Sequence, residues 1–494
     1  MNERIALNPN QLVQHLDKPA EDFTKKDIIK FIEDKGIKML NFRYIGGDGR
    51  LKTLNFVINS KKHLDHILST GERVDGSNLF SYIDAASSDL YVVPRYKTAF
   101  INPFTEVPTV DIMCSYYTRE GKPLESSPEN IIKKAQKMLK EKTGFTFEAL
   151  GELEYYLLSE LEVIYPIIEQ KGYHESHPFS KWGAVRREAM QLISEMGGQI
   201  KYGHAEVGNI VHNDIEMVQH EIEFLPAPVE DAADQLVLAK WAIREVAYKY
   251  HMEVSFAPKI IVGHAGSGLH IHARLVKDDK NMMVDKEGLS DIAKKMIAGF
   301  LQMASSLTAF GNTVPTSFLR LVPRQEAPTS ICWGDSNRSV LVRVPLGWLG
   351  VDNMIKDANP KESGEVFEHM NTQTVELRSP DGSANVHQLL AGMTIAALYG
   401  LENNDSLKIA DDLYVNVDAS TLQSLKQLPA SCYEAAERLL KDRKIYEKYG
   451  VFPPGMIDKL ANDLKAYDDK DMSEKLFGNA DALKEIVDKY IHCG

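Results

Sequence analysis

Short stretches of the sequence place charged side chains at alternate positions, with hydrocarbon side chains between them. Glu152 and Glu154 alternate with leucine and tyrosine, and His270 and His272 alternate with leucine, isoleucine and alanine. A β-strand sends successive side chains to opposite faces, so each stretch predicts a strand with one charged face and one apolar face. The stretches that carry this pattern are 151–157, 219–224, 269–275, 339–345 and 374–378.

A single strand of this kind is most simply explained as part of a sheet with one solvated face. Several strands that combine glutamates with histidines favour a shared site instead. If their charged faces converge, the glutamates repel one another unless cations lie between them. Carboxylates with a histidine are hard ligands, suited to Mg²⁺ or Mn²⁺ and not to a thiolate zinc site. Two such ions beside arginines could stabilise a transferring phosphoryl group.

Common nucleotide-binding motifs are absent from the sequence. It contains no Walker A pattern and no Gly-x-Gly-x-x-Gly pattern, and the glycine-rich turn 263–268 matches neither spacing. Any nucleotide is therefore expected to be held by another architecture.

Composition excludes several classes of protein. The chain has 494 residues and a formal net charge of −13, whereas a nucleic-acid-binding surface needs positive charge. No apolar run reaches the ~18–20 residues of a membrane span, and the longest, 389–401, is broken by glycines and predicts a buried helix. The first residues lack the apolar core of a secretory signal, and the four cysteines lie far apart. We therefore expect reduced thiols in a cytoplasmic protein.

The elements that must position the charged strands follow from local patterns. Helical spacing over 23–35 ends at Gly36, and two extended segments flank Gly46–Gly49 as a hairpin. With further strands over 90–93 and 109–117, this predicts a small α+β unit ending near residue 120. Beyond it, strands alternate with long helices, which the sequence predicts over 128–139, 232–251 and 290–310.

Five motifs, in order along the chain, resemble the glutamine synthetase family of the bacterial type. They are Gly151–Leu157, Gly266–His272, Arg320–Pro328, Asn337–Pro345 and Glu376–Asn385. The resemblance runs from about residue 24 to the C-terminus. It implies an α+β fold with a small β-grasp-like N-terminal domain, residues 1–120, and a large catalytic domain, residues 121–494. The catalytic domain is expected to have a curved antiparallel sheet with surrounding helices.

The resemblance also implies roles for individual residues. The ligands of a first metal, near the amino-acid substrate, are Glu154, Glu206 and Glu221. The ligands of a second metal, beside the ATP phosphates, are Glu152, His270 and Glu376. The residues that face the nucleotide are His272, Arg338 and Arg343. The residues that bind the amino-acid substrate are Glu154, Gly266, Arg320, Glu326 and Arg378. The catalytic residues are Asp75, Glu326 and Arg338.

The implied reaction is the ATP-dependent ligation of ammonia to the γ-carboxylate of glutamate through γ-glutamyl phosphate, with two or more Mg²⁺ or Mn²⁺ ions in each site. Glu326 is expected to close over the ammonium, and Asp75 to take a proton from it. Family members form rings of six, usually two rings stacked as a dodecamer, with Asp75 contributed by a neighbouring subunit. No nucleic acid and no membrane is expected as a partner.

Departures from the family pattern leave alternatives open. His264–Ala265 stands where the family has Asp-Asn, Arg274 replaces a serine, and Thr374 replaces an arginine on the nucleotide side. The chain could therefore ligate a primary amine in place of ammonia, or be a non-catalytic structural or regulatory oligomer, the weakest alternative. The spacing between the proposed ligands at 206 and 221 is long, so Asp214 or Glu216 could replace the second of them.

Overall fold

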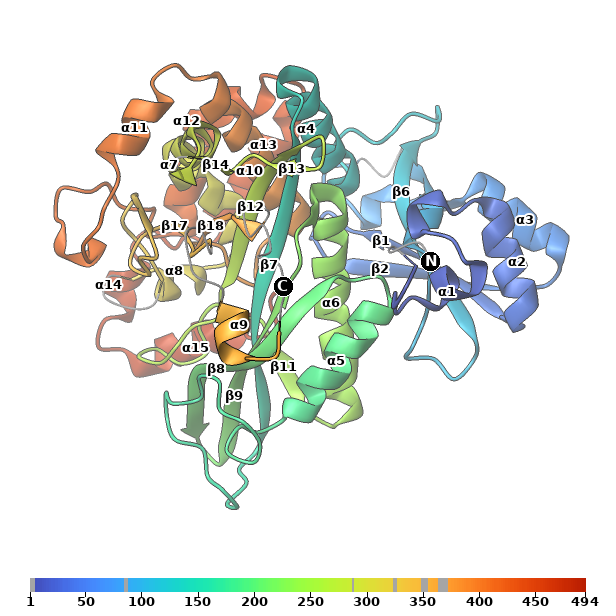
Figure 1. The fold of residues 1–494 in the computed structure, drawn as a ribbon, viewed down its shortest axis with the longest axis horizontal. Helices are drawn as coiled ribbons and strands as arrows, with labels where there is room; N and C mark the ends of the chain where they lie inside the picture. Colours follow the sequence, from blue (N-terminus) through green and yellow to red (C-terminus); the bar gives the residue numbers. More distant parts are fainter. Residues whose placement is uncertain (1–4, 84–87, 287, 323–326, 348–353, 363–371) are drawn as a thin grey trace.

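The structure is a computed structural model that describes residues 5–83, 88–286, 288–322, 327–347, 354–362 and 372–494 (Figure 1). The elements of the N-terminal part are α1 (Gln11–Leu16), α2 (Lys25–Lys35), β1 (Met39–Ile45), β2 (Leu51–Val57), α3 (Lys61–Thr70), β3 (Glu72–Asp75), β4 (Asp89–Pro94), β5 (Phe100–Ile101) and β6 (Thr109–Thr118). Their sheet has the order β2-β1-β6-β4-β3, with β5 beside β6. The pair β1–β6 is parallel and the other pairs are antiparallel.

The rest of the chain forms a larger mixed unit. Its strands are β7 (Thr146–Glu160), β8 (Ile200–His212), β9 (Ile215–Phe224), β10 (Ala227–Pro228), β11 (Glu253–Ser255), β12 (Leu269–Lys277), β13 (Lys280–Asn281), β14 (Val284–Asp285), β15 (Gly288–Leu289), β16 (Trp333–Asp335), β17 (Val342–Val344) and β18 (Val375–Leu377). Its helices are α4 (Pro128–Thr143), α5 (Gly183–Glu195), α6 (Val229–Lys249), α7 (Asp291–Gly311), α8 (Ser317–Arg320), α9 (Met354–Ala358), α10 (Val386–Glu402), α11 (Ser406–Asp412), α12 (Cys432–Glu447), α13 (Pro454–Lys465), α14 (Met472–Leu476) and α15 (Ala480–Tyr490).

The large sheet has the order β16-β17-β18-β12-β7-β9-β8, and among the described residues its β16–β17 pair is parallel and its other pairs are antiparallel. Its apolar face, which includes Leu153 and Ile271, packs in one continuous core with α6, α7 and α10 (Figure 1). Helices α7 and α10 approach so closely that a Cβ on Gly299 would lie 2.0 Å from the carbonyl oxygen of Ala396. Burial of this apolar face leaves the opposite, charged face of the strands to form a site.

The two parts of the chain contact each other through a buried ion pair. Arg95, which follows β4, donates to the Asp234 carboxylate of α6 at 2.7 Å, and His387 of α10 lies 3.0 Å from the same carboxylate. The guanidinium of Arg43 also lies 4.3 Å from the centre of the Trp241 ring. These contacts fix the small sheet against the helices that support the large one.

The α+β prediction is confirmed, with a β-grasp domain at the N-terminus and a large, mainly antiparallel sheet after it. The predicted helix over 23–35 is observed as α2, with Gly36 in the left-handed conformation at its end. The helix predicted from an apolar run is α10, whose residues are almost all buried. All four cysteines are free and buried. No helix among the described residues combines the length and the apolar character needed to cross a bilayer.

Candidate active site

One cavity of about 1920 Å³ lies over the charged face of the large sheet. Strand register explains why the charged side chains meet there. Strand β9 places Glu221 opposite Glu154 and Glu223 opposite Glu152, and β12 places His270 opposite Glu152. Strand β18 also places Glu376 opposite His272. Acids and histidines from four strands therefore lie on the same face of the sheet, which forms the floor of the cavity.

The first cluster on this floor joins β8 to β9. Donor atoms of His204, Glu206 and Glu221 all lie within 4.8 Å of one another, and His204 Nε2 is 3.2 Å from Glu221 Oε1. Burial and the neighbouring carboxylates raise the pKa of Glu221 well above its ordinary value. Burial, together with the nearby Glu206 carboxylate, raises the pKa of Glu154 to about 7. A divalent cation would relieve both penalties, so this donor set fits one.

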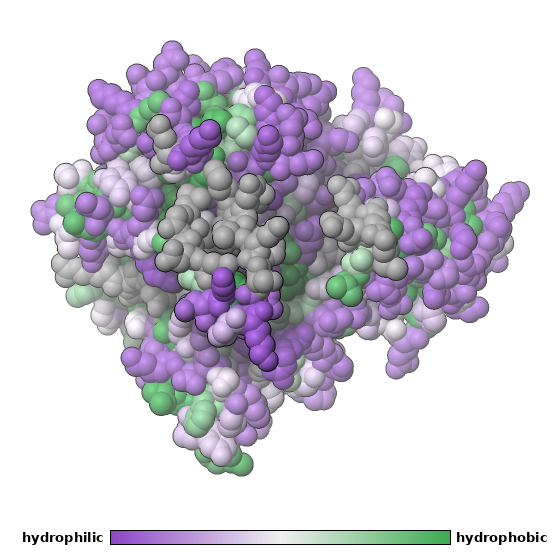
Figure 2. All heavy atoms as spheres, in the orientation of Figure 1, coloured by the Kyte–Doolittle hydropathy of each residue, from purple (hydrophilic) through white to green (hydrophobic). Residues whose placement is uncertain are grey.

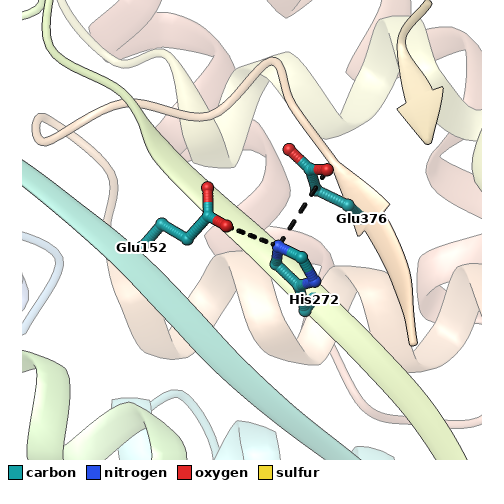
Figure 3. Close-up of side chains that lie close together, drawn as sticks. All are labelled: Glu152, His272 and Glu376. Atoms are coloured by element: carbon teal, nitrogen blue, oxygen red, sulfur yellow. Dashed lines mark hydrogen bonds and ion pairs between the residues drawn. The ribbon is translucent and has the colours of Figure 1, made fainter. Parts of the chain in front are cut away.

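The second cluster joins β7, β12 and β18 (Figure 3). Donor atoms of Glu152, His272 and Glu376 lie within 4.8 Å of one another, and His272 Nε2 is 2.9 Å from Glu152 Oε1. His270 belongs to the same region, because its Nδ1 lies 2.9 Å from Glu152 and 3.5 Å from Glu376. Burial opposes ionisation of Glu152, but the two histidines outweigh it and hold its pKa well below the usual range.

Three side chains of these clusters were not among the predicted metal ligands: Glu223, His204 and His272, of which His272 was predicted to face the nucleotide. Glu223 forms a third group with Glu152 and Glu221, and accepts from Lys201 Nζ at 2.6 Å. Its signal in the sequence is the spacing of two that puts it on the same face of β9 as Glu221. His204 likewise precedes Glu206 by two residues in β8, a strand that the sequence patterns did not predict.

The structure places Glu221, and neither of the alternatives, in the clusters. Asp214 lies in the turn between β8 and β9 with a positive φ of 63°. Glu216 is fully buried but belongs to the other face of β9. Burial raises its pKa there, although the nearby Lys181 partly opposes the shift. The additional residues between the two proposed ligands extend the hairpin away from the cavity and do not insert a competing carboxylate.

All four predicted arginines, Arg320, Arg338, Arg343 and Arg378, line the same cavity. Arg343 donates to Glu376 at 2.9 Å, and Arg378 donates to the same carboxylate at 3.0 Å. Arg378 also donates to the carbonyl oxygen of Arg338. Positive charge therefore lies beside the second cluster.

Arg320 lies between His270 of the second cluster and the turn that holds Gly266. It donates to the carbonyl oxygen of Ser379 at 2.9 Å, and its Nη2 lies 3.3 Å from His270 Nε2. A Cβ on Gly266 would lie 2.4 Å from the carbonyl oxygen of Pro258, so only glycine fits this turn. Gln170 supports the turn by accepting from the amide of Ala265 at 2.8 Å.

One predicted residue is not brought to the cavity within one chain. Asp75 is exposed at the end of β3, and its carboxylate accepts from Ser77 N at 2.9 Å and from Asn78 Nδ2 at 2.6 Å. Hydrogen bonds from Ser77, Ser88 and Asn78 lower the pKa of Asp75. Glu326 lies outside the described residues.

Comparison with known families decides what this site belongs to. The family model described as the glutamine synthetase catalytic domain matches residues 125–475, and that of the glutamine synthetase β-Grasp domain matches residues 36–119. The chain belongs to the glutamine synthetase family. A glutamine synthetase of Clostridium saccharobutylicum is 30% identical over 439 residues, which cover 86% of this chain and 91% of that protein. A Staphylococcus epidermidis glutamine synthetase is 29% identical over 444 residues, or 87% and 92% of the two chains.

Two solved structures share the fold of this glutamine synthetase family member. The cryo-EM structure of Plasmodium falciparum glutamine synthetase superposes with a TM-score of 0.73 at 18% identity, and covers 90% of this chain and 96% of that one. A GmaS complex with ADP superposes with a TM-score of 0.72, with the same identity and coverage. Because the identities are low, these similarities concern the fold.

Proposed function

We propose that the protein ligates ammonia to the γ-carboxylate of glutamate at the expense of ATP. The observation that carries the proposal is the sharing of one cavity by buried carboxylate–histidine clusters and four arginines. A carboxylate is a poor acyl donor because oxide is a poor leaving group. Transfer of the ATP γ-phosphoryl group to a γ-carboxylate oxygen releases ADP and gives γ-glutamyl phosphate. Ammonia then attacks the acyl carbon, and phosphate leaves.

The described side chains divide this work along the floor of the cavity. Arg338 and Arg343 would donate to the transferring phosphoryl oxygens, and Arg320 and Arg378 would hold the substrate carboxylates. When bound, Mg²⁺ or Mn²⁺ ions would supply the positive charge that neutralises ATP and the phosphoryl group. Their proposed protein ligands are Glu154, Glu206 and Glu221 in one group and Glu152, His270 and Glu376 in the other.

The ends of the cavity differ in a way that orients the substrates. Beyond the second cluster the lining becomes partly apolar, with Leu150, Leu225 and Pro226, which suits a nucleotide base. The other end combines Gly266 and Arg320 with the acids of the first cluster, which suits an amino acid and an ammonium ion. We propose that the base of ATP occupies the first end and glutamate the second.

We further propose that the complete site forms between subunits of a homo-oligomer, a dodecamer of two stacked rings. Asp75 is exposed and outside the cavity in one chain, so it can act only on a neighbour's site. Hydrophobic side chains also gather at the lower end of Figure 2, next to the β8–β9 hairpin. The loop between β7 and α5 includes Val163, which is 80% exposed, and Ile168, which is 69% exposed. Exposed apolar patches are typical of protein–protein contact surfaces.

A complementation experiment tests the shared site. Asp75→Asn and Arg338→Ala are each expected to be inactive alone, because each removes a group from every site. Subunits of the two variants mixed by co-expression form some sites with both native groups, so about a quarter of the activity should return if subunits mix at random. Lack of any recovery in verified mixed oligomers would contradict a site built from two subunits.

The acceptor is tested by phosphate release with ATP, Mg²⁺ and glutamate in the presence of ammonium, ethylamine, putrescine or no amine. We expect release to require ammonium. The end of the cavity that holds Gly266 and Arg320 is also lined by Tyr173, Val207 and Ala265, whose carbon atoms could accommodate the alkyl chain of an amine. For this reason a primary-amine ligase is the second candidate. Release with ethylamine or putrescine but not with ammonium would establish that candidate and exclude the first.

A further inference from the structure

His272 has a buried hydrogen-bond partner that the resemblance does not assign. Its Nδ1 lies 2.9 Å from the hydroxyl oxygen of Thr374, while its Nε2 lies 2.9 Å from Glu152 Oε1. Both side chains are buried, His272 at 6% and Thr374 at 5% exposure. Both nitrogens of the imidazole therefore have a hydrogen-bond partner, and Nε2 points at the carboxylates of the second cluster (Figure 3).

The main chain around Thr374 is itself held in place. Thr374 directly precedes β18, and β18 pairs with β12, the strand that carries His272. The Gln373 side chain donates to the carbonyl oxygens of both Pro345 and Thr374 at 3.0 Å. Asn281 in turn donates to the carbonyl oxygen of Gln373 at 2.8 Å. The threonine hydroxyl thus has a fixed position from which to orient the ring.

We propose that Thr374 is a positioning residue that fixes the His272 ring so that Nε2 faces the site of the metal-bound phosphates. A hydroxyl can donate to Nδ1 or accept from it, so the bond persists whichever ring nitrogen carries the proton. Loss of the hydroxyl would leave a buried ring nitrogen without its partner and release the rotation of the ring. The inference rests on the proposed function, because it treats Glu152, His270 and Glu376 as the phosphate-side metal ligands and His272 as the histidine that faces the nucleotide.

Calorimetric titration of ADP in the presence of Mn²⁺ tests the role without relying on turnover. Thr374→Val keeps the shape of the side chain and removes the hydroxyl, whereas Thr374→Ser keeps the hydroxyl. We expect Thr374→Val to weaken Mn²⁺-dependent ADP binding by about tenfold, the lower end of what loss of a ligand-orienting partner costs. Thr374→Ser should stay within about threefold of the wild type. Thermal unfolding of each variant checks that the fold is retained.

A double-mutant cycle shows whether Thr374 acts through His272. In a His272→Ala background, Thr374→Val should add no further loss, because the ring that it orients is gone. Additive losses would overturn the inference, as would wild-type binding by Thr374→Val or equal losses in the valine and serine variants. Failure of the wild type to bind ADP with Mn²⁺ would instead overturn the proposed function, and this inference with it.

Discussion

Replacement of one buried carboxylate in β9 should have opposite effects on the metal-free and the metal-loaded protein. Glu221 lies in two of the carboxylate groups, and burial together with repulsion from its neighbours raises its pKa. Glu221→Gln keeps the size of the side chain and removes the charge. The same strand offers a matched control, Glu216→Gln, because Glu216 is equally buried but belongs to none of the groups found among the described residues.

The magnitude follows from the spacing. Two unit charges 4.8 Å apart, the outer limit within these groups, repel by about 3.5 kcal/mol at an effective dielectric constant of about 20. Protonation of Glu221 already relieves part of this repulsion, so we expect Glu221→Gln to raise the free energy of unfolding of the metal-free protein by on the order of 1 kcal/mol. Saturating Mn²⁺ at a hundred times its dissociation constant stabilises the wild type by about 2.7 kcal/mol per site. The variant should lose most of that gain at the first site.

The assay is thermal unfolding with and without Mn²⁺, together with calorimetric titration of Mn²⁺ alone. Glu221→Gln should unfold at a higher temperature than the wild type without metal and show a smaller upward shift with it. Glu216→Gln should keep the full Mn²⁺ shift, because its carboxylate faces away from the cavity. Loss of the shift in Glu216→Gln with a normal shift in Glu221→Gln would refute the assignment of the ligand.

Three further perturbations follow from the geometry. Asp234→Asn should lower the free energy of unfolding at neutral pH by about 3–5 kcal/mol, because Arg95 is left buried without its carboxylate. Burial disfavours the charge of Asp234, but Arg95 and His387 outweigh burial and lower the pKa of Asp234. The ionised carboxylate therefore stabilises the fold above about pH 4, and this stabilisation is lost as the pH falls. Chemical denaturation across pH should accordingly show a weaker acid destabilisation in the variant than in the wild type. Gly266→Ala forces a Cβ to within 2.4 Å of the Pro258 carbonyl oxygen. The kcat/KM for glutamate should therefore fall roughly tenfold or more, which is equivalent to about 1.4 kcal/mol. Unchanged kinetics would exclude close packing of this turn. Arg343→Lys keeps the charge but not the two-pronged donor, and should lower kcat by roughly 10²-fold, with a normal kcat contradicting its role at the phosphoryl group.

The charged strands could be predicted from the sequence because the alternation of side chains is local. Glu152 and Glu154 share a face whatever the sheet does, and so do His270 and His272. The order of the strands is not local, however, so the pairing of His272 with Glu376 and of Glu154 with Glu221 became known only from the register.

Other parts of the site had a weaker signal or none. Strand β8 contains a register irregularity between Ala205 and Asn209, which interrupts the alternation of side chains along the strand, so no sequence pattern predicted the strand that carries His204. The hydrogen bond between Thr374 and His272 joins residues 102 positions apart, and no pattern in either segment predicts it. The role that we propose for Asp75 requires a second subunit, so no single chain can display it.

The central claim is that a γ-carboxylate oxygen of glutamate leaves the reaction in phosphate. It is tested most directly with glutamate labelled with ¹⁸O in the γ-carboxylate, incubated with ATP, Mg²⁺ and ammonium. Activation through γ-glutamyl phosphate predicts that each released phosphate carries one ¹⁸O atom, and that glutamine retains the other. Release of unlabelled phosphate under the same conditions would show that ATP is hydrolysed without activating the carboxylate, and would contradict the proposed reaction.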